Sequence, residues 1–113
     1  MDAGKLKEFR ETLQTLAAQI SAADAETLKD RAPVELDQQA VGRLSRMDAL
    51  QVQAMAQETS RRRGTELRRI TAALARMDEG EFGDCIECGE EIAARRLALD
   101  PAAPLCIDCA SGR

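Results

Sequence analysis

The chain has 113 residues, about the length of one domain, with a formal net charge of −4 and no histidine, tryptophan or tyrosine. Its two phenylalanines, Phe9 and Phe82, are too few to seed a large globular core, and its Ala, Leu, Ile, Val and Met content suits helices packed in pairs. The net charge does not favour DNA, although residues 41–79 carry 8 basic and 5 acidic groups. Without histidine there is no ready general base near neutral pH, and no phosphate loop or nucleophile motif occurs, so we expect no enzyme.

The N-terminal residues are charged from the start and lack the apolar core of a signal peptide. No stretch approaches the roughly 18–20 apolar residues that span a bilayer. We therefore expect a cytoplasmic protein without a membrane segment, in a compartment that keeps thiols reduced.

Residues 5–29 are predicted to form a single helix. Apolar side chains recur there at alternating steps of three and four, at Leu6, Phe9, Leu13, Leu16, Ile20 and Ala23. This is the a/d spacing of a helix that packs along a narrow seam against another helix. Pro33 disfavours helical geometry at the residue before it, so this helix is expected to end by Asp30.

A second, longer helix is predicted up to Glu79. Asp37 is the favoured start, because its carboxylate can cap a helix; Ser45, with Asp48 at capping-box spacing, is the alternative. The two helices then form a long antiparallel hairpin, or coiled coil, over residues 1–79, with its tip at about residues 30–48. Because the second helix is longer, its C-terminal end is expected to overhang the first.

The four cysteines form two C-x-x-C pairs separated by 17 residues, at Cys85, Cys88, Cys106 and Cys109. This spacing matches a four-thiolate zinc site, in which two tight turns complete a tetrahedron. Redox dithiols, structural disulfides and an iron–sulfur cluster are weaker alternatives, since no strand–helix redox unit and no secretory signal accompany the pairs. Four thiolates leave no open position, so we expect one structural zinc organising residues 80–113. Gly89 suits the left-handed backbone of the first turn, whereas Ala110 follows the second.

The cysteine segment resembles the C4 zinc finger of the bacterial DksA/TraR family. The matching features are Phe82-Gly83 before Cys85, Glu91-Ile92, Arg95-Arg96-Leu97, Pro101, and Leu105-Cys106-Ile107-Asp108-Cys109. The predicted hairpin also fits the architecture of this family. The fold class that follows is mainly α, a long helical hairpin with a small C-terminal zinc finger.

The resemblance implies a regulator of transcription that binds RNA polymerase and inserts its coiled-coil tip into the secondary channel. Some members respond to guanosine tetraphosphate. We accordingly expect RNA polymerase as the partner, a monomer, and no direct sequence-specific DNA binding. A nucleic-acid-binding zinc module and a coiled-coil interaction adaptor are the alternatives.

The sequence departs from the family pattern at the tip and at the nucleotide-responsive positions. Active members carry D-x-x-D-x-A at the tip, and ungapped counting from Cys85 places Gly42, Ser45 and Met47 there. Asp37 and Asp48 are the acidic candidates for contact with the partner, although a helix cap is the plainer role for both.

By the same counting, Arg69 keeps the basic residue of the nucleotide-responsive positions, whereas Asp100 replaces an arginine and Ala110 a lysine. Arg69 is thus a third candidate for partner contact, and we expect a weak or atypical nucleotide response.

One dense basic run lies in the second helix, at Arg61, Arg62, Arg63, Arg68 and Arg69. A run of this size is most often a solvated helix face, and a phosphate or an acidic partner is the alternative. Gly64, inside the run, costs roughly 1 kcal/mol of helix stability relative to alanine and marks either a bend or the close approach of another chain.

Overall fold

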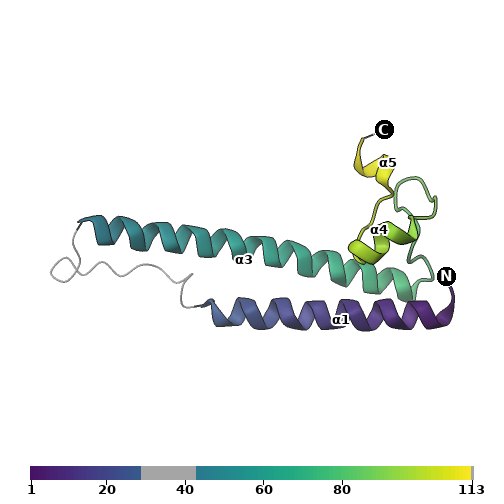
Figure 1. The fold of residues 1–113 in the computed structure, drawn as a ribbon, viewed down its shortest axis with the longest axis horizontal. Coiled ribbons are helices and arrows are strands. Elements are labelled where there is room, and N and C mark those ends of the chain that lie inside the picture. Colours follow the sequence, from purple (N-terminus) through teal and green to yellow (C-terminus); the bar gives the residue numbers. More distant parts are fainter. Residues whose placement is uncertain (29–42, 113) are drawn as a thin grey trace.

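The structure is a computed structural model that describes residues 1–28 and 43–112 (Figure 1). Four helices are described: α1 (Ala3–Glu26), α3 (Arg43–Asp78), α4 (Ala94–Leu99) and α5 (Ile107–Ala110). Among the described residues, β-structure is limited to one isolated antiparallel bridge between Asp84 and Glu91. The predicted fold class is confirmed: two long helices lie side by side, and the small cysteine-containing segment packs at the end where the N-terminus lies.

Helix α1 begins two residues earlier and ends three residues earlier than the sequence predicts. Asp2 is the N-cap, and its Oδ1 accepts a hydrogen bond of 2.8 Å from the amide of Lys5. This capping interaction satisfies one of the free amides of the first turn, which explains the earlier start. Thr27 is the C-cap.

Helix α3 runs without interruption for 36 residues, about 54 Å at 1.5 Å per residue. It continues as a helix through Gly64, so the glycine does not interrupt it. The alternative start at Ser45 is wrong, because the helix already includes Arg43. The favoured start at Asp37 lies outside the described residues.

The C-terminal end of α3 has the geometry of a Schellman motif. Gly80 has a positive φ of 77°, its amide donates to the carbonyl of Met77, and the amide of Glu81 donates to the carbonyl of Arg76. These two bonds satisfy carbonyl groups that the helix end leaves free. The sequence correctly predicts the helix end at Gly80, because glycine adopts this backbone conformation without steric cost.

The prediction that the C-terminal end of α3 overhangs α1 is wrong, because the N-terminal end of α3 is the one that extends beyond the described part of α1. Arg10 of α1 pairs with Asp78 in the last turn of α3 at 2.9 Å, so α1 extends past the end of α3. At the other end, Asp24 of α1 lies 3.6 Å from Arg63, and residues 43–62 of α3 continue beyond the described end of α1 (Figure 1). The apolar seam of α1 packs against the C-terminal part of α3, where Ile70, Ala73 and Met77 are buried.

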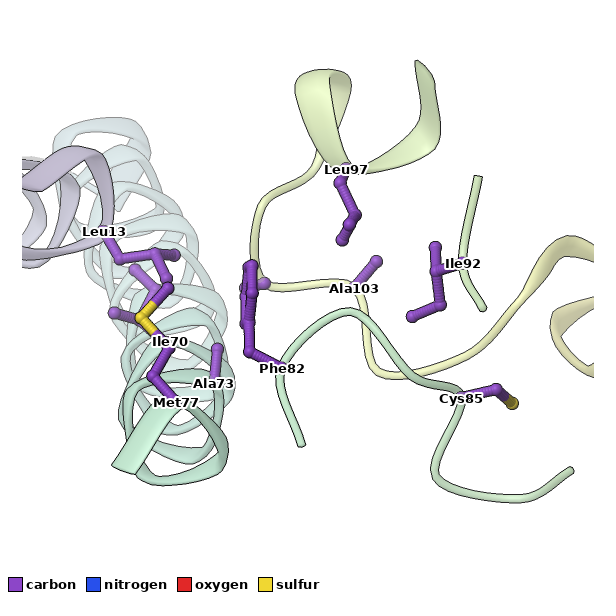
Figure 2. Close-up of a cluster of buried hydrophobic side chains, with 10 residues drawn as sticks. Leu13, Ile70, Ala73, Met77, Phe82, Cys85, Ile92, Leu97 and Ala103 are labelled. Atoms are coloured by element: carbon purple, nitrogen blue, oxygen red, sulfur yellow. The ribbon is translucent and has the colours of Figure 1, made fainter. Parts of the chain in front are cut away.

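One hydrophobic core joins the hairpin to the cysteine-containing segment. Leu13 and Ile70 are the largest fully buried side chains and lie between α1 and α3. Figure 2 shows Phe82 between these hairpin residues and the side chains of Ile92 and Leu97. The ring of Phe82 also meets that of Phe9 at a centroid distance of 5.4 Å. Both phenylalanines of the chain therefore serve this junction, which is how two aromatic residues suffice for a small core.

Arg63 is expected to stabilise the hairpin far more than its equally basic neighbours. Its Nη1 donates to Thr27 Oγ1 at 3.0 Å and to the carbonyl of Ala23 at 3.4 Å, at the end of α1, and it pairs with Asp24. Because these contacts are three-quarters shielded from solvent, we expect Arg63→Ala to lower the free energy of unfolding by about 1–2 kcal/mol in urea titrations.

Arg62→Ala provides the matched control. The side chain of Arg62 is 79% exposed, and its ion-pair partner is Glu58 on the same helix. Exposed pairs of this kind contribute little, so a change below about 0.5 kcal/mol is expected. Equal effects of the two substitutions would show that Arg63 does not anchor the end of α1.

Candidate zinc centre and its junction with the hairpin

The first cysteine pair lies in a tight turn held by backbone hydrogen bonds. The amide of Cys85 donates to the carbonyl of Glu90 at 2.8 Å, and the amide of Gly89 donates to the carbonyl of Cys85 at 3.0 Å. Gly89 has a φ of +77°, as the sequence predicts for this turn. The turn therefore presents the thiols of Cys85 and Cys88 on one side.

The second pair uses a different device, the first turn of a helix. Cys106 is the N-cap of α5, and its Sγ accepts a hydrogen bond from the amide of Cys109 at 3.5 Å. Ala110 follows as the last residue of this right-handed helix. A helical turn requires no left-handed residue, which explains why the second pair has no glycine after it.

The four sulfurs, from Cys85, Cys88, Cys106 and Cys109, lie within 4.8 Å of one another, and all four residues are free thiols. The Sγ atoms of Cys88 and Cys106 are 3.7 Å apart. Tetrahedral zinc with Zn–S bonds near 2.3 Å requires sulfurs about 3.8 Å apart. The donor set and its spacing therefore fit one structural zinc with no position left for a substrate.

The thiols influence each other's ionisation in a way that favours a bound cation. Hydrogen bonds from the backbone of Cys88, and then of Cys106, lower the pKa of Cys85 to about 6. The pKa of Cys109 is raised, first by the side chain of Cys106 and then by those of Cys85 and Cys88. A second thiolate in so small a cluster is thus disfavoured unless a cation balances the charge. A divalent metal that binds thiolates supplies this balance, and its binding weakens as the pH falls.

Arg96 positions the second cysteine pair, a role that sequence reasoning missed. Its Nε donates to the carbonyl of Leu105, the residue before Cys106, at 2.9 Å. The amide of Ile86 donates to the carbonyl of Pro104 at 3.0 Å and so ties the two turns together. The sequence marks Arg96 only as part of the Arg95-Arg96-Leu97 match to the zinc finger of the family, which does not indicate this contact.

Arg69 and Asp100 join α3 to the end of α4. Arg69 Nη2 lies 2.6 Å from Asp100 Oδ2, and Arg69 Nη1 lies 2.7 Å from a carboxylate oxygen of Glu66. Burial opposes the charged form of Arg69, but the hydrogen bonds to Asp100 and Glu66 outweigh it and raise the pKa of the guanidinium. The sequence identifies both residues, but not their contact.

Asp48, another predicted contact residue, is not part of this junction. Asp48 is exposed and is the sixth residue of α3, too far into the helix for the predicted capping role. Asp37 lies outside the described residues. Ala110 is exposed at the end of α5.

Most of the basic run has partners within the chain. Arg61 and Arg62 both pair with Glu58, and Arg68 donates to Thr65 Oγ1 at 3.1 Å. Arg63 and Arg69 make the contacts described above. The run therefore combines an exposed helix face with two structural arginines.

None of the helices that the structure describes combines the length and apolar character needed to cross a membrane.

Comparison with known proteins gives matches to the cysteine segment and to the whole fold. Residues 80–113 match the family described as the prokaryotic dksA/traR C4-type zinc finger. Over 43 residues, the chain is 51% identical to the RNA polymerase-binding transcription factor DksA of Haemophilus influenzae and 44% identical to that of Escherichia coli K12. Each match covers 38% of this chain, and 30% and 28% of the respective relative.

The solved structure of transcription factor DksA2 from Pseudomonas aeruginosa resembles the whole fold. The TM-score is 0.73 at 29% sequence identity, and the match covers 99% of this chain and 84% of that one. The hairpin and the cysteine segment thus have the same arrangement in both. Residues 80–113 therefore match the C4-type zinc finger of the DksA/TraR family, as the resemblance in the sequence predicts.

Proposed function

We propose that this protein is a transcription factor that binds RNA polymerase and inserts its hairpin tip into the secondary channel. The observation that carries the proposal is the shared arrangement of hairpin and C4 finger with transcription factor DksA2 over nearly the whole chain. The names of the curated relatives, which match the finger segment, supply RNA polymerase as the partner.

The shape of the hairpin supports insertion. Residues 43–62 of α3 extend beyond the described end of α1 and add roughly 30 Å of reach at 1.5 Å per residue. This part of the helix exposes large apolar side chains, with Met47 at 58% and Met55 at 63%. A slender helical projection with adaptable methionines suits contact inside a narrow channel.

The finger has a supporting role in this proposal. Residues 80–113 form a unit that one zinc organises, with Cys85, Cys88, Cys106 and Cys109 as its ligands. Because four thiolates saturate the metal, the zinc supplies folding energy rather than catalysis. The protein then acts as a binding factor, as a monomer.

Direct sequence-specific DNA recognition has no support in the described surface. The finger segment is rich in carboxylates, and most of the basic run on α3 already pairs with side chains of the chain itself. The junction also supports a weak response to guanosine tetraphosphate, since Asp100 occupies the guanidinium of Arg69.

Crosslinking tests the proposed insertion. A photo-crosslinking residue in place of Met47 or Asp48 is expected to label the polymerase secondary channel near the active site. A crosslinker at Lys7, which is exposed near the finger end of α1, is the matched control and is expected to label outside the channel. Identical labelling of the outer surface from both ends would argue against insertion, and no labelling in a complex isolated with core polymerase would do so as well.

A further inference from the structure

A groove separates the start of α1 from the zinc finger and has a volume of about 510 Å³. One wall is Met1 and the first turns of α1, including Lys5 and Phe9, and the other wall is the turn at Phe82 together with α4. This volume lies within the range of roughly 300–1,000 Å³ that is typical of binding sites.

The floor of the groove is apolar and pre-formed. Phe82, Ile92 and Leu97 line it and are at most 7% exposed, and Phe9 stands against Phe82. Figure 2 shows Phe82, Ile92 and Leu97 converging on one core. A rigid floor of this kind accepts one bulky apolar side chain without rearrangement.

The rim of the groove is acidic. Glu8, Asp84 and Glu91 line it and are exposed, and none of them has an ion-pair partner among the residues that the structure describes. Asp84 and Glu91 are paired across the isolated bridge, which holds their backbones side by side. Asp2 adds a fourth carboxylate and Lys5 a single cationic side chain.

We propose that this groove is a docking site for a protein segment that carries one bulky apolar side chain flanked by lysine or arginine. The apolar floor accounts for the anchor, and the unpaired carboxylates select the flanking charges, since opposite potentials across an interface guide recognition. The same carboxylates repel nucleic acid and acidic peptides. This site is independent of the hairpin tip, so the proposal goes beyond the proposed function and does not depend on it.

The test uses the zinc-loaded full chain and synthetic peptides in two-dimensional amide NMR. A peptide Lys-Lys-Ala-Phe-Ala-Lys-Lys is expected to shift signals of residues 5–9, 82–84 and 91–98, with affinity that falls as salt is added. Replacing its Phe by Ser, or its lysines by glutamates, is expected to abolish the shifts. The double variant Glu8→Lys, Glu91→Lys is expected to weaken binding roughly tenfold or more, because two charge-assisted contacts become repulsive.

The double variant Glu11→Lys, Glu79→Lys is the matched control, because both residues are exposed, lie outside the groove and change the net charge equally. It is expected to bind the peptide like the parent chain. If both variants weakened peptide binding equally, or if the peptide shifted the amide signals of acidic residues all over the protein, binding would depend only on the net charge. Either result would overturn the proposal. Shifts that appear at the groove without peptide as the protein concentration rises would identify a second copy as the occupant, which would also overturn it.

Discussion

Replacing Cys88 by serine is expected to abolish zinc binding and unfold the finger, while most of the helical signal of the hairpin remains. Structural zinc supplies an apparent binding free energy of about 10–16 kcal/mol in isolated zinc-finger peptides, and that energy is folding energy. The finger has little else to hold it, since its helices α4 and α5 span 6 and 4 residues. Helices α1 and α3 span 24 and 36 residues and pack on each other through Leu13 and Ile70.

Three measurements check this expectation. Metal analysis of the reduced parent chain is expected to find one zinc, and none in the variant. Far-ultraviolet circular dichroism is expected to retain most of its helical intensity, whereas amide NMR signals of residues 83–112 are expected to collapse to unfolded positions. Adding a chelator to the parent chain is expected to give the same picture, because removing the metal and removing a ligand have the same effect on the finger.

Ile86→Ser is the matched control for this substitution. Ile86 lies in the same turn and is 62% exposed, but it carries no thiol. It is expected to leave the zinc content at one. Iron in the purified protein, or a folded and reduced finger without metal, would contradict the zinc assignment. Loss of all helical signal in the Cys88 variant would instead show that the hairpin and finger fold as one unit.

Transcription from a promoter sensitive to this family is expected to respond weakly to the protein, and guanosine tetraphosphate is expected to add little. The finger and hairpin are in place, so under the proposed function we expect the deficit at the nucleotide-responsive positions and not in binding to polymerase. At the nucleotide-responsive positions, Arg69 already pairs with Asp100 at 2.6 Å, and Ala110 offers no charge. Each missing charge-assisted contact is worth on the order of 1.5–3 kcal/mol, so two of them weaken nucleotide coupling by tenfold or more.

The double variant Asp100→Arg, Ala110→Lys tests this account by gain of function. It removes the ion pair of Arg69 with Asp100, leaves the one with Glu66, and adds two cations. The nucleotide effect on transcription is therefore expected to increase at least tenfold in effective concentration, given the contact energies above. The variant Glu79→Arg, Ala75→Lys is the control. Ala75 lies on α3 and Glu79 directly follows it; both are exposed, and the change in net charge is the same. An increase in both variants would trace the effect to general charge.

The parent chain could instead change transcription as strongly as a fully active family member, with a strong effect of guanosine tetraphosphate. That result would contradict the expectation that the tip and the Arg69–Asp100 junction make the protein a weak regulator. The acid that works at the tip would then be Asp37 or Asp48, and replacing each by asparagine would identify which one.

Sequence alone was sufficient for the features that depend on local spacing. The apolar steps from Leu6 to Ile20 predict a helix with a packing seam, and two C-x-x-C pairs predict a tetrahedral thiolate site, because both patterns reflect geometry within a few residues. Gly80 and Gly89 mark the helix end and the first turn for the same reason, and both have a positive φ in the structure.

Only the tertiary structure decided how these pieces meet. The alignment of α1 with the last third of α3 depends on the pairing of Arg10 with Asp78 and of Arg63 with Asp24, between residues 68 and 39 positions apart in the chain. Helical periodicity defines a face but not its register along a partner helix, so the overhang could not be placed from the sequence. The pairing of Arg69 with Asp100, and the groove beside Phe9 and Phe82, likewise exist because the zinc finger folds back onto the hairpin. Such long-range contacts produce no recognisable spacing in a single sequence, whereas the metal ligands are recognisable as two C-x-x-C pairs.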